Sequence, residues 1–255
     1  MKDRLSFQSL TNLKYELPIS RQKILITGAS SGIGKATALA LVKLGVSVAL
    51  VSRNPHSVLA EITAARKDED VTVKAYALDL GDVGSVAIAV KKIVADFGGI
   101  DVLINNAGMA YIGEIVDMPL ADWQKILDLN LTSVFQCIQA VLPIMRQQKH
   151  GAIVNVASIA AKQAFPKWGA YSASKFALLG MTQALAAEEQ SHGIKVMSIC
   201  PGSVNTPLWD TVEANFNRES MLQESTVAES IIYLLSLPAN AIVTDMVLMP
   251  NVGVL

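Results

Sequence analysis

The chain lacks the features that would direct a protein into a membrane, onto nucleic acid or into an oxidising compartment. Two of its 255 residues are cysteines, Cys137 and Cys200, and both have apolar neighbours, which is typical of small buried side chains. No basic block occurs, and the formal net charge is −1. Neither an apolar run of membrane-spanning length nor a signal-peptide core is evident. We therefore expect a cytoplasmic protein without nucleic-acid or membrane partners.

Histidine is scarce as well. The three histidines, His56, His150 and His192, fall in expected turns or at expected helix ends, and none has an acidic partner at a suggestive spacing. The cysteines have no metal-ligand spacing to a histidine either, although metal sites in proteins are built from clusters of such side chains. We therefore expect no metal site.

Apolar residues make up 51% of the chain and charged residues 17%, which favours a compact globular protein. Seven short apolar runs are expected to be strands: 23–27, 46–51, 71–78, 100–105, 152–158, 194–200 and 242–249. Helical patterns lie between them at 33–44, 55–67, 83–97, 119–148, 171–191 and 226–236. Such alternation is typical of a parallel sheet buried on both faces. The sequence therefore predicts an α/β, single-domain Rossmann fold: a doubly wound, mostly parallel seven-stranded sheet with helices on both faces.

The predicted domain covers residues 23–255. Residues 1–22 differ from the rest and are expected to form an extension, with one short helix through Phe7, Leu10 and Leu17 as an option. In a doubly wound sheet, ligands bind beyond the carboxyl ends of the strands, near the point where the strand order reverses. Chemically active residues are therefore expected just after the strands.

The first predicted strand runs into the turn "TGASSGIGKA", in which three glycines precede a helix. Glycines in such a turn let backbone amides approach a pyrophosphate at the helix N-terminus. The spacing is G-x-x-x-G-x-G rather than G-x-G-x-x-G, and glycines alone also mark tight turns that bind nothing. The position between a strand and a helix favours a dinucleotide site, for which we expect Gly28, Ser30, Ser31, Gly32, Ile33 and Gly34.

The end of the second predicted strand bears on the choice of cofactor. An NAD site places a carboxylate there to accept hydrogen bonds from the ribose 2′-hydroxyl, whereas an NADP site needs a cation for the 2′-phosphate. This chain has Ser52, Arg53 and Asn54 and no acid. Arginine binds phosphate bidentately, although it is also common in exposed loops. We expect Arg53 and Asn54 to favour NADP (NADPH).

Several further motifs, in order, resemble those of the short-chain dehydrogenase/reductase family, from about residue 23 to the C-terminus. "TGASSGIG" is similar to the family's coenzyme turn, and "NNAG", "LNLTSVF", "NVASIAA", "YSASK" and "CPGSVNTP" follow at compatible spacings. The resemblance implies that the cofactor also contacts Asp79, Leu80, Asn106, Ala107, Gly108, Tyr171, Lys175, Pro201, Gly202, Val204 and Thr206.

The resemblance also implies a catalytic tetrad of Asn130, Ser158, Tyr171 and Lys175. In such a tetrad Tyr171 donates a proton to a carbonyl that accepts hydride, and Ser158 positions and stabilises its oxygen. Lys175 binds the nicotinamide ribose and favours tyrosinate, while Asn130 holds a water that joins Lys175 to bulk solvent. Bringing the tyrosine pKa from ~10 to ~7 requires about 4 kcal/mol, which we expect Lys175 and the oxidised nicotinamide to supply.

These motifs predict an NADPH-dependent oxidoreductase that reduces a ketone or aldehyde to an alcohol. A 3-oxoacyl-thioester reductase of the fatty-acid type is an alternative, although the C-terminal "TDMVLMPNVGVL" departs from the Gly-rich end of the best-known members. A protein that binds NADPH as a sensor without catalysis is an alternative of another class. A nucleotide-sugar epimerase or dehydratase would need a larger substrate domain than the 49 residues after Thr206.

Two segments are expected to determine the substrate: "IAAKQAFPKWGA", between Ser158 and Tyr171, and "SVNTPLWDTVEANFNRESM", after Gly202. They supply an apolar wall of Phe165, Trp168, Leu208, Trp209, Val212 and Phe216, to which Met109 and Tyr111 can add. The same surfaces can instead close over the cofactor or pack between subunits. Arg218 and Lys167 are single candidates for binding an acidic substrate, and no convincing pair of cations occurs.

The helices expected near 119–148 and 171–191 carry more apolar residues than one sheet face needs. These residues include Ile126, Leu127, Phe135, Ile138, Leu178, Leu179 and Met181. In the family that the chain resembles, the equivalent helices form a dimer interface, often within a tetramer. We therefore expect a homodimer or homotetramer that acts on a small-molecule carbonyl substrate.

Overall fold

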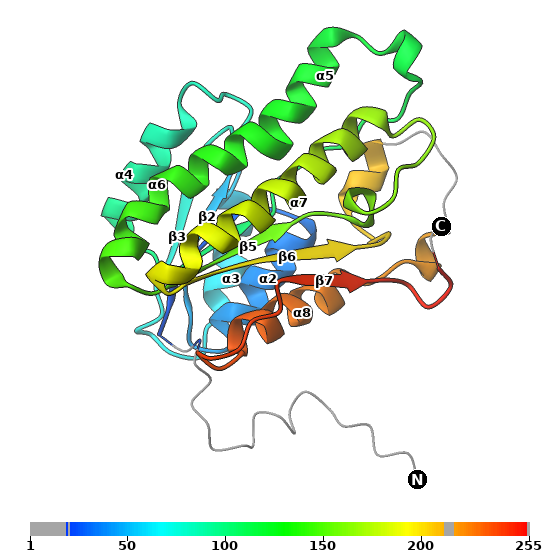
Figure 1. Ribbon diagram of the computed structural model, residues 1–255. Coiled ribbons are helices and arrows are strands. Elements are labelled where there is room, and N and C mark those ends of the chain that lie inside the picture. The colour runs from blue at the N-terminus through cyan, green and yellow to red at the C-terminus, as the bar shows by residue number, and fades with distance from the viewer. Residues whose placement is uncertain (1–18, 20, 212–216, 254–255) are drawn as a thin grey trace.

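The computed structural model describes residues 19, 21–211 and 217–253 (Figure 1). The possible helix through Phe7, Leu10 and Leu17 therefore lies outside the described residues. Seven parallel strands form one sheet in the order β3-β2-β1-β4-β5-β6-β7, which confirms the predicted fold class. The strands are β1 Lys23–Thr27, β2 Ser47–Ser52, β3 Val73–Ala77, β4 Val102–Asn105, β5 Gly151–Val156, β6 Ile194–Pro201 and β7 Asp245–Leu248.

Helices cover both faces of the sheet (Figure 1). One face carries α2 Gly32–Val42, α3 His56–Ala64 and α8 Glu224–Ser236, and the other carries α4 Val86–Phe97, α6 Ser133–Gln148 and α7 Gly169–Glu189. Helix α5, Leu120–Leu127, continues through a π-helical turn, η2 Asp128–Thr132, into α6. Short 3₁₀ turns are η1 Ile115–Asp117, η3 Ile159–Ala161, η4 Gln190–His192, η5 Pro207–Thr211 and η6 Arg218–Ser220.

The continuous apolar character of the strands is explained by two cores, one on each face of the sheet. Successive side chains of a strand point to opposite faces. In β1, Leu25 packs into the core under α4, α6 and α7, whereas Ile24 and Ile26 pack into the core under α2 and α8. All three are fully buried. Because both faces are covered, a strand in this sheet needs apolar residues at every position.

The strand order places a switch point between β1 and β4. The chain moves from β1 through β2 to β3 on one side, and from β4 through β5 and β6 to β7 on the other. The loops that leave the carboxyl ends of β1 and β4 therefore turn in opposite directions and leave a crevice between them. The predicted chemical residues follow these strand ends.

One continuous helical stretch, Leu120–Gln148, is long and apolar enough to cross a membrane. This corrects the expectation that no run reaches that length, and it arises because η2 joins α5 and α6 without a break. Within it, Val134, Ile138, Val141 and Met145 are buried in the core beside α4 and α7. The core helix of a globular protein satisfies the same criteria of length and composition.

The residues expected at a subunit interface separate into two groups. Ile126, Ile138, Leu178 and Leu179 are buried within the chain's own core and so are not available to another subunit. Phe135 of α6 is 45% exposed, and so is Phe176 of α7, which was not among the residues expected there. The homo-oligomer stays a prediction, and these two rings are the parts of α6 and α7 that best suit an interface.

A buried row of polar side chains fixes α7 to the sheet. The amide of Asn105 donates to Asn155 Oδ1 at 2.9 Å, and Asn155 Nδ2 donates to the Thr182 hydroxyl at 2.8 Å. All three side chains are at most 2% exposed. Because water cannot replace these partners, the row ties β4, β5 and α7 in one relative position.

We predict that Asn155→Leu lowers the free energy of unfolding by about 1–3 kcal/mol, because it leaves the amide of Asn105 buried without its acceptor. Urea unfolding of the cofactor-free protein measures this. Asn251→Leu, the same change at an exposed position, is the matched control. Equal stability of the two variants would contradict the prediction.

Candidate active site

The glycines of the first turn are required by its geometry. Gly28 has a φ of +66°, a conformation that residues with a Cβ rarely adopt. A Cβ at Gly34 would lie 2.3 Å from the carbonyl oxygen of Gly28. The N-cap residue of α2, Ser31, makes no side-chain hydrogen bond to the helix, and the first turn of α2 contains no acid. The α2 N-terminus is therefore suited to an anionic group.

Thr27, which the sequence interpretation missed, joins this turn to the loop after β4. Its hydroxyl oxygen accepts hydrogen bonds from the backbone N–H groups of Asn106 at 2.9 Å and Ala107 at 3.1 Å. The Asn106 amide donates in return to the carbonyl oxygens of Thr27 and Gly28. A hydroxyl at the end of an otherwise apolar strand was the available signal. These bonds hold the two loops together at the switch point.

A cleft of about 710 Å³ runs along the carboxyl ends of the strands. Its lining includes all but one of the residues expected to bind cofactor, namely Gly28, Ser30, Ser31, Gly32, Ile33, Arg53, Asn54, Asp79, Leu80, Asn106, Ala107, Gly108, Tyr171, Lys175, Pro201, Gly202, Val204 and Thr206. Gly34 is the exception, because it lies behind the turn against Gly28. Residues that are 178 positions apart in the chain therefore share one surface.

Ser158, Tyr171 and Lys175 meet at the end of β5. A side-chain hydrogen bond joins Tyr171 to Ser158. The Ser158 hydroxyl oxygen accepts a separate hydrogen bond from the Ala160 N–H at 3.1 Å. Lys175 lies one turn further along α7, with its Nζ 5.7 Å from the centroid of the Tyr171 ring. The Nζ donates to the carbonyl oxygen of Val156 at 2.9 Å. The spacing of Tyr171 and Lys175 thus brings both into the cleft.

Burial controls the titration of both α7 side chains. It raises the pKa of Tyr171 above its ordinary value of 10, and the hydrogen bond from Ser158 acts in the opposite direction. It lowers the pKa of Lys175 from 10.5 to about 8. In the cofactor-free protein, desolvation outweighs the hydrogen bond with Ser158. The expected shift of the Tyr171 pKa toward 7 includes the oxidised nicotinamide and stays a prediction.

Asn130 does not line the cleft, although the sequence interpretation placed it in the catalytic tetrad. Its side chain is fully buried in the π-helical turn. The amide accepts from the Met109 N–H at 2.9 Å and donates to the Met109 carbonyl and the Ser174 hydroxyl. These bonds give the side chain a role in positioning the loop after β4, and the water that Asn130 is expected to hold stays a prediction. A Cβ on Gly108 would lie 3.3 Å from Asn130 Oδ1 and 3.7 Å from Lys175 Nζ.

Aromatic and apolar side chains line the substrate end of the cleft. Met109, Phe165, Trp168, Leu208 and Trp209 lie there as the sequence predicted, whereas Tyr111 does not. Val212 and Phe216 fall outside the described residues. The Trp168 ring meets that of Tyr171 edge-on, with centroids 5.4 Å apart. The wall therefore begins directly beside the Tyr171 phenol.

A polar cluster that the sequence did not reveal lies behind Ser158. Asp245 Oδ1 accepts from the Ser198 hydroxyl at 2.7 Å and from the Cys200 thiol at 3.4 Å, and Lys162 forms an ion pair with the other oxygen. Burial acts to raise the pKa of Asp245, but these hydrogen bonds hold it below its usual value. Burial raises the pKa of the Cys200 thiol to about 11. Among the described residues, no group of three potential metal ligands comes together.

Comparison with known proteins identifies the family. The model of the short chain dehydrogenase family matches residues 22–217. The chain belongs to this family. It is therefore an oxidoreductase, as its motifs predicted.

Individual relatives support this assignment. A 3-oxoacyl-[acyl-carrier-protein] reductase from Synechocystis sp. is 38% identical over 239 residues, covering 89% of this chain and 94% of that protein. The solved structure of an alcohol dehydrogenase from Thermococcus sibiricus, complexed with 5-hydroxy-NADP, has a TM-score of 0.82 at 26% identity and covers 91% of this chain and 97% of its own. A metagenomic short-chain oxidoreductase in complex with NADP has a TM-score of 0.78 at 29% identity, with 91% and 99% coverage.

We predict that Lys175→Met stabilises the cofactor-free protein at neutral pH. Because the folded-state pKa of about 8 lies below the unfolded value, the unfolded chain binds more protons between pH 8 and 10.5, and stability rises with pH there. Below pH 8 the full cost of the buried cation applies, about 3 kcal/mol, and about 1 kcal/mol of it is offset by the bond to Val156. The variant should therefore gain about 2 kcal/mol at pH 7.

The measurement is urea unfolding of both proteins at pH 7 and pH 10.5, with Lys43→Met, at an exposed position, as the control. The gain should vanish at the higher pH. A variant that is less stable than the wild type at pH 7, or whose gain is independent of pH, would show that Lys175 is not a destabilising cation.

Proposed function

We propose that the protein is an NADPH-dependent oxidoreductase that reversibly reduces a ketone or aldehyde to an alcohol. The observation that carries this proposal is the joint placement of Ser158, Tyr171 and Lys175 in the long cleft beside the glycine turn. A carbonyl that accepts hydride needs a proton donor and a hydrogen bond to its oxygen at one place. The Tyr171 and Ser158 hydroxyls can supply both.

The cleft suits a nicotinamide dinucleotide along its whole length. The uncapped N-terminus of α2, with Gly28, Gly32 and Ser31, would hold the pyrophosphate, and Asp79 and Leu80 would border the adenine. Pro201, Gly202 and Thr206 would hold the nicotinamide end. When bound in its reduced form, the cofactor supplies the hydride.

The protein's own residues handle the proton. The raised pKa of Tyr171 keeps its phenol protonated at neutral pH, which is the form that donates. Ser158 holds the phenol by a hydrogen bond and can offer its own proton to the same carbonyl oxygen. As Tyr171 loses its proton, the buried charge of Lys175 stabilises the phenolate that forms.

The preference for NADPH rests on Arg53. It follows β2 at the rim of the cleft, and Asn54 lies beside it. No acid occupies either position, so nothing there repels a 2′-phosphate. The Thermococcus sibiricus and metagenomic structures are complexes with 5-hydroxy-NADP and NADP, which supports the same cofactor here.

A second candidate function is the reduction of 3-oxoacyl thioesters. The likeness to the Synechocystis 3-oxoacyl-[acyl-carrier-protein] reductase favours it. Both candidates use the same proton donor, so they differ only in the group that enters the substrate end of the cleft. An NADPH sensor without catalysis would have no need of the Ser158–Tyr171 hydrogen bond.

We predict that Tyr171→Phe lowers kcat by roughly 10²-fold or more, because it removes the general acid and leaves the ring in place. NADPH consumption with ketones, aldehydes and 3-oxoacyl thioesters measures this. Calorimetry should show that the variant still binds NADPH. Turnover that survives the substitution would refute the role of Tyr171, and no turnover by the wild type on any of these carbonyl compounds would favour the sensor.

We predict that Arg53→Asp weakens NADPH binding by about 10²-fold and leaves NADH binding unchanged or stronger. The substitution removes a charge-assisted bond to the 2′-phosphate and adds repulsion. Cofactor fluorescence titration gives both dissociation constants, and Lys67→Asp, on the exposed surface after α3, is the control for charge alone. An equal effect of Arg53→Asp on NADPH and NADH would exclude a phosphate-specific role.

A further inference from the structure

The segment that follows β6 is fixed at its base before it reaches the substrate end of the cleft. The Asn205 N–H donates to the Leu222 carbonyl at 2.8 Å, and the Leu222 N–H donates to the Ser203 carbonyl at 2.9 Å. Val204 and Leu222 thereby form a parallel bridge. The segment between Val204 and Leu222 therefore begins and ends at this bridge.

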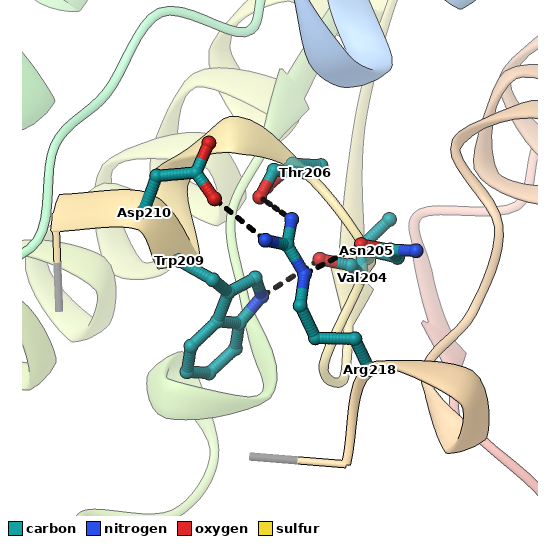
Figure 2. Close-up of polar contacts among 6 residues, drawn as sticks. All are labelled: Val204, Asn205, Thr206, Trp209, Asp210 and Arg218. Carbon is teal, nitrogen blue, oxygen red and sulfur yellow. Dashed lines mark hydrogen bonds and ion pairs between the residues drawn. The ribbon is translucent and has the colours of Figure 1, made fainter. Parts of the chain in front are cut away.

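Arg218 fastens this segment a second time, from η6 (Figure 2). Its Nε donates to Asn205 Oδ1 and its Nη2 to the Thr206 carbonyl, both at 2.8 Å, while Nη1 pairs with Asp210 Oδ1 at 2.5 Å. The planar guanidinium thus has acceptors on three residues of one short stretch. These contacts fix η5, which carries Trp209, relative to the strand end.

Trp209 completes a row of aromatic rings that begins at Tyr171. Its indole N–H donates to the Val204 carbonyl at 2.7 Å (Figure 2), so the hydrogen-bonding edge of the ring is directed to the backbone. The ring meets Trp168 edge-on at 5.9 Å, and Trp168 meets Tyr171 in the same manner at 5.4 Å. Both tryptophans line the cleft, so a group attached to the reacting carbonyl would contact their rings.

Beyond Lys175 beside Tyr171, the described lining of this part of the cleft carries no cation. The described lining residues include two cations, of which Arg53 lies at the end of β2 and Lys175 donates to the Val156 carbonyl. The sequence interpretation considered Arg218 and Lys167 as binding residues for an acidic substrate. Arg218 is paired with Asp210, and the Lys167 ammonium lies 3.9 Å from Glu114 with its side chain 58% exposed.

From this geometry we infer that the pocket selects neutral ketones that carry an aromatic ring, with Trp168 and Trp209 as its walls and Arg218 as the residue that positions Trp209. This inference rests on the proposed function and specifies its substrate class. Edge-on aromatic contacts favour an aromatic group over a saturated one of equal size. A carboxylate in the same place would be desolvated without a partner.

Two matched pairs of ketones test the substrate class. 4-Phenylbutan-2-one and 4-cyclohexylbutan-2-one carry similar carbonyl groups and differ in the ring, whereas levulinate and its methyl ester differ in charge. We expect kcat/KM to be about three- to tenfold higher for the phenyl ketone than for the cyclohexyl ketone. The methyl ester should likewise be reduced faster than levulinate.

Variants test the positioning role. Trp209→Leu should abolish the preference for the phenyl ketone through an increase in KM, and Trp209→Phe should restore part of it. Arg218→Met should act like Trp209→Leu, and Asp210→Asn, at a side chain that is 60% exposed, removes the ion pair with less disturbance. The third tryptophan, Trp123 of α5, does not line the cleft, so Trp123→Leu is the control. Calorimetry reports NADPH affinity separately for each variant.

The outcomes distinguish this inference from the proposed function. If the wild type reduces none of these ketones nor any other carbonyl compound, both are overturned. If it reduces ketones but favours the cyclohexyl compound or levulinate, the substrate class is wrong and the proposed function stands. If the phenyl preference survives both Arg218→Met and Asp210→Asn, Arg218 does not position Trp209.

Discussion

The position of α7 over the carboxyl end of β5 is the constraint on which the site depends. Lys175 donates to the Val156 carbonyl, and Asn155, one residue earlier in β5, donates to Thr182 two turns further along α7. Two polar contacts, both shielded from water, therefore fix the rotation and the height of the helix against the strand. Tyr171 shares the helix face of Lys175, so the same two contacts bring its hydroxyl to Ser158.

The two halves of the cleft are built differently. On the cofactor side, backbone geometry determines the shape, since Gly28 and Gly34 leave no room for side chains and the Thr27 hydroxyl joins the loops after β1 and β4. On the substrate side, side chains determine it, through Arg218 and the two tryptophans. A backbone-built site suits one ligand common to a family, whereas a wall of side chains can change by substitution and so admit different substrates.

The sequence predicted the parts of the structure that depend on the backbone better than those that depend on contacts between distant side chains. The strands were predicted to within a few residues because a doubly covered sheet requires continuous apolar runs, and the cleft residues followed because each lies just after a strand or opens a helix. The side-chain contacts of Asn130, Arg218 and Asp245 were missed, since their partners lie 8 to 83 positions away and no local pattern identifies them. The titration of Tyr171 likewise depends on burial, which a motif does not reveal.

The raised pKa of Tyr171 also bears on the direction of catalysis. The raised pKa keeps the Tyr171 phenol protonated at neutral pH, which is the form that the proposed reduction needs, and it also makes that phenol a weaker acid. Oxidation of an alcohol would need the phenolate, and desolvation opposes that anion unless a cation lies near. Lys175, with a pKa of about 8, is still charged at neutral pH but loses part of its charge in the alkaline range where a phenolate would form. Under the proposed function, further stabilisation of the phenolate would come from the hydrogen bond with Ser158 and from the positive charge of the oxidised cofactor, so the ionisation of Tyr171 would be coupled to the redox state of the dinucleotide.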